Sequence, residues 1–448
     1  MSSSECSSGD DLVFYEEIFP FEGPPRIASG NRDIVITDTT LRDGQQGWRE
    51  FTVEEGLRIY RVLAELGSAI ESTELFLYTP KDRKLVSAIK SLELSNPRPI
   101  GWIRASLSDL KLLQEAGLKE TVILASISDY HIHFKFGLSR EQAFEKYLSV
   151  VEEALKLGIS VRCSLEDFTR ASPSRNIFPF VSKLMKLSER YRSQIRIKLA
   201  DTLGLGLPFP DIPPPRGIPA VIRLLTDGMG VPGGSIEFHG HNDLGLVVAN
   251  HLAAWIYGAR ASNCTLMGIG ERTGNCPLEV MLIHYVGIKG HDGTANLKAI
   301  REAAQLFRSL GLKIPEFQPL VGENAFRTKA GIHIDGLMKN PKIYLPFDPI
   351  SVLGIPYGVA ITPHSGRSAI ALWVSSHLDG GKIDAKHVLA LKEDPRLEAL
   401  YNELMKLFDE KRSLNDDELM RIAVKYFPEL DRRNLNGRND DNREDLII

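Results

Sequence analysis

The sequence predicts an α/β protein built on a TIM (β/α)8 barrel, followed by a mainly helical C-terminal lid or subdomain. Eight strand-like segments alternate with helix-like segments between residues 33 and 288. Strict alternation of this kind favours a parallel sheet, and eight units of this length favour a closed barrel. Beyond residue 290 the alternation stops and helical spacing dominates.

The first strand is predicted at DIVIT, residues 33–37, and a capping-box pattern at Thr52–Glu55 begins the helix behind it. The later strands are predicted at 68–76, 98–106, 120–126, 159–167, 194–202, 234–241 and 261–268. The later helices are predicted at 81–92, 107–116, 139–157, 175–190, 216–227, 243–257 and 277–287.

An open doubly wound sheet is the alternative fold. Such a sheet usually carries a Gly-rich phosphate-binding turn after its first strand, whereas this chain has TTLRDGQQG at 39–47. The Gly-x-Gly of GIGERTG at 268–274 follows the last strand and lacks the onward spacing of a dinucleotide-binding motif. The closed barrel is therefore the preferred prediction.

The pattern divides the chain into four segments. We expect an N-terminal extension, a barrel domain, a lid with a helical subdomain, and a charged tail that is too polar to form a core, at 1–30, 31–290, 291–430 and 431–448. In the third segment, helices are predicted at 297–311, 394–408 and 415–426, and a mixed, loop-rich region at 320–370.

Composition and charge narrow the classes of function. The net charge of −4 gives no electrostatic support for binding nucleic acid. No apolar run is long enough to span a bilayer, and the first residues lack the features of a secretory signal, so no membrane role is expected. Four cysteines without a C-x-x-C pair fit a reduced, cytoplasmic setting, and Cys264 and Cys276 are expected to be packing residues.

The carboxyl ends of the predicted strands are unusually polar, and the chemistry of a TIM barrel is located there. His239 and His241 point to the same side of their strand and can together bind one divalent ion. Asp43, beyond the first strand, can complete a mixed N/O site. Two surface histidines are the alternative for an isolated H-x-H. The HIH at 131–133 has the same spacing but is expected to lie in a loop.

Other polar side chains at these ends are also candidates for the site. They are Arg42, Gln46, Glu74, Arg162, Ser164, Glu166 and Thr202. Glu74 and Glu166 could instead be structural carboxylates paired with arginines. Asp201 and Thr202 could instead cap the turn that follows them.

Four motifs make the sequence recognisable. DTTLRDGQQ, HGHNDLGLVVAN, GIGERTGN and VGENAFRTKAGIHIDGL occur in this order. Together they resemble the DRE-TIM metallolyase superfamily and its Claisen-condensing branch, which includes 2-isopropylmalate, homocitrate, citramalate and Re-type citrate synthases. The resemblance covers residues 33–370 and implies a TIM barrel, a C-terminal lid, a divalent metal ion, and condensation of an acyl-CoA with a 2-oxo acid.

The resemblance also implies roles for individual residues. Asp43, His239 and His241 would be metal ligands, with Asn275 nearby. Arg42, His333 and Tyr344 would serve catalysis, with Arg42 stabilising the alkoxide and His333 acting in acid–base steps, and we add Glu166 to this set from its place at a strand end. Substrate contacts would come from Gln46, Arg162 and Thr202, and we add Glu74 and Ser164 to this set from their places on the strands. Mn²⁺, Co²⁺ or Mg²⁺ is the expected metal, with Zn²⁺ as a further candidate. In the resembling synthases a homodimer exchanges its lids.

Arg162 bears on the choice of substrate. It falls where homocitrate synthases place an arginine for the distal carboxylate, and a guanidinium facing an isopropyl group would be poorly satisfied. Ser106 stands where those synthases tend to have a histidine, and GWIRA, SDYHI and LEDFTRA look most like the Re-citrate synthase group. Acetyl-CoA and oxaloacetate are therefore the expected substrates. 2-Oxoglutarate, 2-oxoisovalerate, an acyl-CoA lyase activity and a non-catalytic scaffold are the alternatives.

Overall fold

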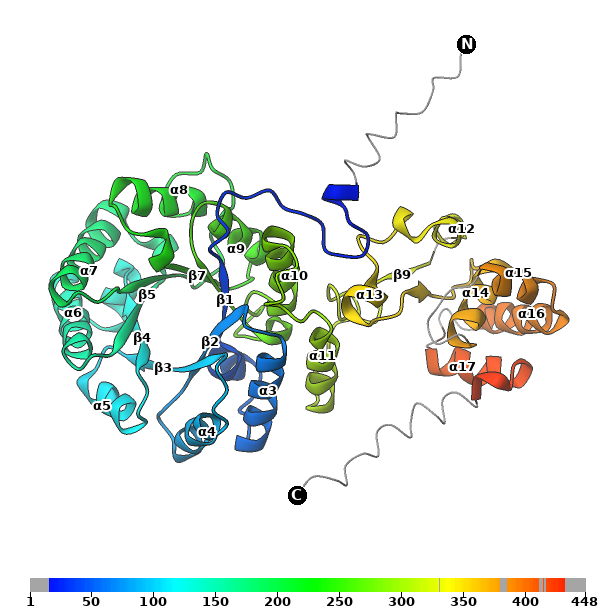
Figure 1. The fold of residues 1–448 in the computed structure, drawn as a ribbon, viewed down its shortest axis with the longest axis horizontal. Coiled ribbons are helices and arrows are strands. Elements are labelled where there is room, and N and C mark those ends of the chain that lie inside the picture. Colours follow the sequence, from blue (N-terminus) through cyan, green and yellow to red (C-terminus); the bar gives the residue numbers. More distant parts are fainter. Residues whose placement is uncertain (1–15, 330, 379–384, 411–413, 415, 432–448) are drawn as a thin grey trace, which may run out of the picture. The chain divides into compact units, whose positions relative to one another are not determined.

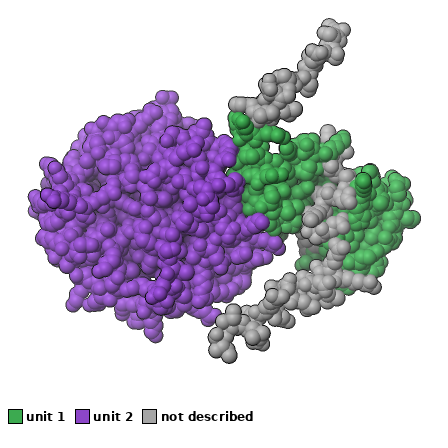
Figure 2. Space-filling view, viewed as in Figure 1, with its two compact units in different colours: residues 1–25, 314–448 green, residues 26–313 purple. Residues whose placement is uncertain are grey.

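A computed structural model describes residues 16–329, 331–378, 385–410, 414 and 416–431 of the chain. Two compact units are distinguished in Figure 2. The barrel unit contains residues 26–313, and the C-terminal unit contains the described parts of 1–25 and 314–448. The four segments expected from the sequence remain a prediction, and most of the expected tail lies outside the described residues.

The barrel unit is a closed ring of eight parallel strands in chain order, which confirms the predicted fold class (Figure 1). β1 closes the ring by pairing with β8, from Val35 opposite Ala261 to Asp38 opposite Cys264. The strands are β1 (Val35–Asp38), β2 (Ile70–Leu75), β3 (Arg98–Arg104), β4 (Glu120–Ser126), β5 (Ser160–Glu166), β6 (Arg196–Asp201), β7 (Ile236–Gly240) and β8 (Ala261–Cys264).

Helices surround this ring at the predicted places. They are α3 (Val53–Glu65), α4 (Pro80–Ser91), α5 (Leu107–Glu115), α6 (Arg140–Lys156), α7 (Phe178–Tyr191), α8 (Ile218–Arg223), α9 (Val247–Ile256), α10 (Leu278–Lys289) and α11 (Ala299–Ser309). The capping box that begins α3 forms as predicted, because Thr52 and Glu55 each accept the other's backbone N–H. α8 is shorter than predicted because the chain continues as a π-helical turn at Leu224–Gly228.

The chain after the first strand forms a turn that the sequence did not predict and that matters for the site. β1 ends at Asp38, so Arg42 and Asp43 lie not on the strand but in a π-helical turn, Thr40–Gly44, that precedes the short helix α2 (Gln45–Gly47). The Thr39 carbonyl accepts the backbone N–H groups of Arg42 and Asp43 at 3.2 and 2.8 Å. The turn is therefore tight, and it buries both side chains at the carboxyl end of the barrel.

The C-terminal unit is mainly helical, as predicted. Its helices are α12 (Gly331–Lys339), α13 (Pro349–Leu353), α14 (Arg367–Leu378), α15 (Ala385–Lys392), α16 (Pro395–Glu410) and α17 (Asp416–Tyr426). Two short parallel strands, β9 (Arg327–Thr328) and β10 (Gly358–Val359), were not predicted. The unit has its own core, in which Trp373, Leu400 and Phe427 are buried. In the described part of the chain, no helix has the length and hydropathy needed to span a membrane.

Candidate active site

Inward-facing side chains meet in a cavity of about 230 Å³ at the carboxyl end of the barrel. Its lining residues are Arg42, Asp43, Gln46, Trp102, Leu124, Lys135, Ser164, Glu166, Ala200, Thr202, His239, His241 and Glu271. Most residues that the sequence nominated for the barrel site thus lie around one space, although they come from the turn and short helix after β1, from β5 and β7, and from just beyond β6 and β7.

Asp43, His239 and His241 form the tightest group of the cavity. Asp43 Oδ2 lies 3.3 Å from His239 Nε2 and 3.5 Å from His241 Nε2. One ligand atom from each residue can be chosen so that all three lie within 4.8 Å of one another, which is close enough to hold one metal ion. Asn275 lies beside the group and donates from Nδ2 to Asp43 Oδ2 at 3.1 Å.

The protonation states of this group suit a cation. Burial alone would raise the pKa of Asp43, but Arg42 and the two histidines hold that pKa well below its usual value. Burial, with help from His239, lowers the pKa of His241 to about 4. At neutral pH, Asp43 is therefore an anion and His241 is neutral, the forms in which these side chains bind metals.

An unpaired oxygen provides a test of the fit to a metal ion. Asn275 Oδ1 is buried and has no hydrogen-bond partner among the described residues. A buried carbonyl oxygen without a donor is costly unless a cation or a water satisfies it. One carboxylate, two imidazoles and one amide oxygen make a mixed N/O donor set, which Mn²⁺, Co²⁺, Mg²⁺ or Zn²⁺ can use.

Arg42 is held rigidly against this group. Its guanidinium contacts Asp43 Oδ1 at 3.1 Å and Glu74 Oε2 at 2.9 Å, and it lies 5.3 Å from the centre of the Trp102 ring. Glu74 is fully buried and also contacts Lys198. Burial would raise the pKa of Glu74, but Lys198 and Arg42 lower it to about 2. Glu74 therefore lies behind Arg42 as an anionic support, not among the residues that line the cavity.

Arg162 does not lie where the sequence interpretation placed it. Its side chain is fully buried near the start of β5, and it is not among the lining residues. All three nitrogens of its guanidinium form ion pairs. Nε lies 2.6 Å from Glu120, Nη1 lies 2.9 Å from Glu237, and Nη2 lies 3.4 Å from Glu71. A strand rises ~3.3 Å per residue, so Arg162 lies about 13 Å below Glu166 along β5. The expected contact with a distal carboxylate does not fit this placement.

Glu166 lines the cavity together with a lysine that sequence reasoning missed. Lys135 Nζ lies 2.9 Å from Glu166 Oε2, and Ser126 donates to the same oxygen. Burial would raise the pKa of Glu166, but His131 and Lys135 help to lower it to about 2. His131 Nδ1 lies 3.1 Å from the carboxylate. The HIH segment, expected to be a simple loop, is thus a π-helical turn (His131–Lys135) that supports the cavity wall.

The remaining barrel candidates take different positions. Ser164 is buried in the cavity wall and Gln46 is exposed at the rim. Thr202 lines the cavity and accepts the Asp167 backbone N–H at 2.9 Å. Asp201 instead caps the following turn, accepting the Leu205 and Gly206 backbone N–H groups, so the structural alternative holds for Asp201.

Sequence reasoning also missed two residues behind the lining. Lys198, from β6, and Asn263, from β8, are buried and contact Glu74. Both lie on the inward face of their strands, so the alternation of inward and outward side chains along each strand could have identified them. Cys264 faces outward from β8 and, like Cys276, is fully buried. Burial raises the pKa of Cys276 well above its usual value, which fits a packing role for this thiol.

His333 and Tyr344 belong to the C-terminal unit. Their rings lie against each other with centroids 4.6 Å apart. His333 is on α12 and is exposed, and Tyr344 is 39% exposed. The pair is therefore open to a substrate or another surface, and its catalytic role stays a prediction.

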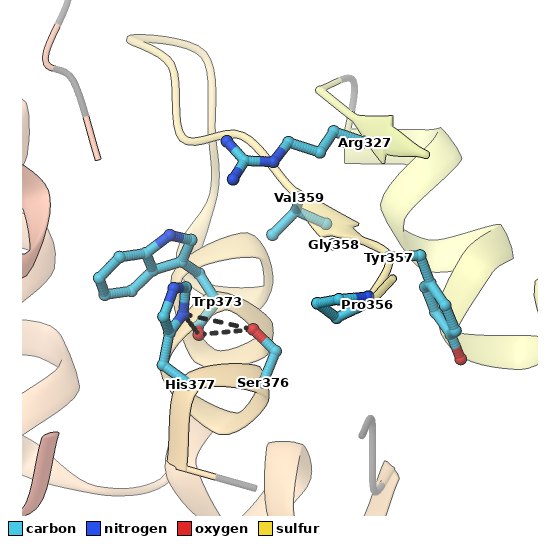
Figure 3. A pocket seen from close by; sticks show the side chains of 8 residues that line it. All are labelled: Arg327, Pro356, Tyr357, Gly358, Val359, Trp373, Ser376 and His377. Atoms are coloured by element: carbon cyan, nitrogen blue, oxygen red, sulfur yellow. Dashed lines mark hydrogen bonds between the residues drawn. The ribbon is translucent and has the colours of Figure 1, made fainter. Parts of the chain in front are cut away.

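The C-terminal unit also has a cavity of its own, of about 240 Å³. Figure 3 shows Trp373, Ser376 and His377 of α14 along one side of it and Arg327 across from them. The His377 ring lies over the Trp373 ring, with centroids 4.1 Å apart. None of the residues that the sequence nominated for catalysis or binding lines this cavity.

A parallel eight-stranded barrel with a carboxylate–imidazole group at the carboxyl ends of its strands defines a TIM-barrel protein with a candidate metal centre. Residues 33–307 match the family described as HMGL-like. Residues 320–386 match the domain described as homocitrate synthase post-HMGL domain-like. The chain belongs to the HMGL-like family.

Relatives refine this assignment. A citrate (Re)-synthase of Clostridium kluyveri is 40% identical over 94% of this chain and 95% of its own length. A 2-phosphinomethylmalate synthase of Streptomyces hygroscopicus is 39% identical over 82% of this chain and 86% of its own length. More distant relatives include 2-isopropylmalate and homocitrate synthases. The predicted membership of the condensing branch of the DRE-TIM superfamily is therefore confirmed.

A solved structure resembles the fold. The hydroxymethylglutaryl-CoA lyase from Pseudomonas aeruginosa matches with a TM-score of 0.51 and 20% identity, over 63% of this chain and 95% of that chain. At this identity the likeness supports the barrel alone.

Proposed function

We propose that this chain is a citrate (Re)-synthase, which condenses acetyl-CoA with oxaloacetate and releases citrate and CoA. The observation that carries the proposal is the relationship to the Clostridium kluyveri citrate (Re)-synthase, which extends over nearly the whole of both chains. The cavity supplies what such a reaction needs, namely a candidate metal group, a fixed guanidinium and an anionic support beneath it.

A divalent ion bound by Asp43, His239 and His241 would bind the oxo acid and polarise its carbonyl group. Asn275 would contribute its unpaired Oδ1 or orient a water. Arg42 would stabilise the negative charge that develops on the carbonyl oxygen. Because Glu74 and Asp43 already hold the Arg42 guanidinium, it would need little reorganisation during the reaction.

The condensation requires a base near the acetyl methyl group. We assign this role to His333, with Tyr344 beside it. The base removes a methyl proton, the resulting carbanion forms a C–C bond with the carbonyl carbon, and the alkoxide takes up a proton. Water then cleaves the thioester and CoA leaves as a thiol.

Lys135 is the best candidate in this chain for contacting the distal carboxylate of oxaloacetate. It lines the cavity, and its side chain remains 43% exposed beside Glu166. Arg162 was expected to do this, but its guanidinium is fully used by glutamates. Ser164 and Thr202 would add hydroxyl groups to the same wall.

The finer proposals concern metal and assembly. Mn²⁺, Co²⁺ or Mg²⁺ is preferred, because the donor set is rich in nitrogen and oxygen and contains no thiolate. A cytoplasmic homodimer is proposed in which the C-terminal unit of one chain serves the barrel of its partner, so that His333 would complete the other chain's site.

A panel of oxo acids tests the function. Purified protein with acetyl-CoA and Mn²⁺ should release free thiol with oxaloacetate and much more slowly with 2-oxoglutarate or 2-oxoisovalerate. Faster release with 2-oxoisovalerate would instead make the chain a 2-isopropylmalate synthase. Thiol release without any oxo acid would identify simple hydrolysis.

Isotope labelling tests the face of attack. Citrate made from ¹³C-labelled acetyl-CoA can be cleaved by a citrate lyase of Si specificity. Attack on the Re face leaves the label in the oxaloacetate product, whereas attack on the Si face returns it in acetate. Label in acetate would contradict the proposed stereochemistry while leaving the condensation intact.

A further inference from the structure

Asn263 joins the candidate metal group to the charged residues below it. It lies on the inward face of β8, where its side chain is fully buried. Asn263 Oδ1 lies 2.8 Å from His239 Nδ1. Asn263 Nδ2 lies 2.9 Å from Thr37 Oγ1 and 3.2 Å from Glu74 Oε1.

Glu74 determines which way the amide of Asn263 must face. Glu74 contacts two cations, Arg42 and Lys198, and receives the Thr39 hydroxyl at 3.0 Å. A carboxylate in such surroundings is ionised and can only accept hydrogen bonds. The NH₂ group of Asn263 must therefore face Glu74, because a flipped amide would place two acceptors against each other.

Thr37 gives an independent reason for the same orientation. Its hydroxyl donates its one hydrogen to Glu237 Oε1, 3.1 Å away. Thr37 Oγ1 can then only accept from its other neighbour, Asn263 Nδ2. Two separate carboxylates, Glu74 and Glu237, thus impose one amide orientation on Asn263.

The orientation has a consequence for His239. Asn263 Oδ1 is an acceptor, so the hydrogen of the neutral imidazole is on Nδ1 and the Nε2 lone pair is free. His239 Nε2 lies 3.3 Å from Asp43 Oδ2. Two electron-rich atoms at this distance favour a cation between them. The other tautomer would place an N–H against Asp43, where it would compete with a metal ion.

We propose that Asn263 is a positioning residue that holds His239 in the tautomer able to bind the metal ion, and that Glu74 fixes the orientation of the Asn263 amide. This inference rests on the proposed metal-dependent function. It assigns a role to a residue outside the motifs, and it gives Glu74 a second task besides supporting Arg42. Groups behind metal ligands commonly contribute about 10- to 100-fold in metal affinity.

Metal affinity of the full-length protein tests the proposal without any assay of turnover. Metal-free protein is titrated with Mn²⁺, and free Mn²⁺ is followed by electron paramagnetic resonance. Asn263→Leu keeps the side-chain size but removes the acceptor, so Mn²⁺ should bind about 10- to 100-fold more weakly. Thermal unfolding of the same samples shows that the variant is folded.

Ser262→Ala is the matched control. Ser262 is the neighbouring residue of β8, and its Oγ lies 2.6 Å from Nδ1 of His251. It supports a buried histidine in the same manner, but that histidine belongs to a different group, with the thiols of Cys264 and Cys276, which suit Mn²⁺ poorly. Mn²⁺ affinity should therefore be unchanged in Ser262→Ala.

A paired exchange separates positioning from simple packing. In Asn263→Asp, a second carboxylate faces Glu74, and metal binding should weaken. Adding Glu74→Gln supplies an amide that donates to the new carboxylate, which then accepts from His239 Nδ1. The double variant should therefore bind Mn²⁺ more tightly than Asn263→Asp alone, which a purely structural role does not predict.

The outcomes distinguish this inference from the function on which it rests. Wild-type protein that binds no Mn²⁺ would contradict the metal site and, with it, the role of Asn263. Wild-type protein that binds Mn²⁺, together with a folded Asn263→Leu variant that binds it equally well, would overturn the role of Asn263 alone. A folded double variant that binds Mn²⁺ no better than Asn263→Asp would show that Glu74 does not orient the side chain at position 263.

Discussion

Two charged clusters occupy the barrel interior, and they differ in how completely their polar atoms are satisfied. In the lower cluster, the Arg162 guanidinium is paired with Glu71, Glu120 and Glu237. In the upper cluster, formed by Asp43, His239, His241 and Asn275, nitrogen and oxygen atoms converge within a few ångströms. One of them, Asn275 Oδ1, has no partner in the described part of the chain.

The difference separates structural charge from functional charge. A buried charge network that is closed on itself has nothing left to offer a ligand and contributes to the integrity of the barrel. A cluster with unpaired lone pairs costs stability until a cation or substrate completes it. By this criterion we propose that the lower cluster is structural and that the upper cluster is the place for chemistry.

Removing the metal tests the upper cluster and should have the largest effect. Chelation should abolish turnover, and adding Mn²⁺ back should restore it. Asn at position 43 keeps the size of the side chain but loses the charge, so Asp43→Asn should be inactive and should lose tight Mn²⁺ binding. Loss of the anion leaves Arg42 with Glu74 as its partner, so thermal unfolding should show a folded variant of similar or somewhat lower stability. Full activity in protein shown to be metal-free by elemental analysis would contradict this assignment.

Hybrid dimers test whether the upper cluster is completed by another chain. His333→Ala should lower turnover by about 10²- to 10⁴-fold, as expected for loss of an acid–base group. Homodimers of His333→Ala and of Asp43→Asn should both be nearly inactive. After mixing and reassembly, a hybrid dimer would contain one intact barrel facing one intact C-terminal unit, and it should recover one working site.

The hybrid experiment has a clear negative outcome. Differently tagged subunits allow hybrid dimers to be purified and verified before the assay. If verified hybrids remain as inactive as both parents, each C-terminal unit serves its own barrel, and the exchanged dimer is wrong. Mixed samples of each variant with itself control for reactivation by the reassembly procedure.

Arg162→Ala tests the lower cluster. The change leaves Glu120 and Glu237 without their main cation inside the barrel, so it should cost about 3–5 kcal/mol of folding free energy, measured by urea unfolding. Arg190→Ala is the control, because Arg190 is 68% exposed and pairs with Glu152 at the surface. It should cost at most about 1 kcal/mol.

The same variant can still support the original sequence interpretation. If Arg162→Ala has wild-type stability and a raised KM for oxaloacetate, the residue contacts substrate and the lower cluster is not purely structural. Loss of stability with an unchanged KM in the folded enzyme would support the structural role.

The sequence predicted the barrel well because its signal is repeated eight times. Each strand and helix could be recognised from local periodicity, and errors at single boundaries did not change the ring. The candidate metal group was also recognisable, since His239 and His241 lie two residues apart in the sequence and point to the same side. The similarity of DTTLRDGQQ to known synthases identified Asp43, although periodicity did not predict the π-helical turn that carries it.

Depth within the barrel was the missing information. Alternation shows that Arg162, Ser164 and Glu166 face inward, but it does not show which of them reaches the cavity. Arg162 lies in the lower cluster because its partners, Glu71, Glu120 and Glu237, come from the first two residues of three other strands. Ion pairs between the side chains of strands far apart in sequence decide this depth. Lys135 was missed for another reason, since it lies in a π-helical turn without a clear period.

The ion pair between Lys135 and Glu166 lies at the edge of the upper cluster and should have the smallest effect on folding stability. Lys135 Nζ is 2.9 Å from Glu166 Oε2, but 43% of the lysine side chain is exposed, so the pair should contribute about 1 kcal/mol or less. Lys135→Met should therefore lower the free energy of unfolding by that amount at about pH 7, measured in urea.

The contribution of this pair should depend on pH in a defined direction. Burial opposes ionisation of Glu166, but His131 and Lys135 help to lower its pKa from 4.5 to about 2 in the folded chain. Ionised Glu166 thus stabilises the folded state fully above pH 4.5, and this stabilisation is lost as pH falls toward 2. The difference between wild type and Lys135→Met should shrink in that window.

Lys146→Met is the matched control, because Lys146 and Lys135 both lie over the Phe136 ring, at 5.2 and 5.4 Å. A difference for Lys135→Met that stays constant from about pH 7 to about pH 3.5 would show that the lysine acts through the ring and not through Glu166.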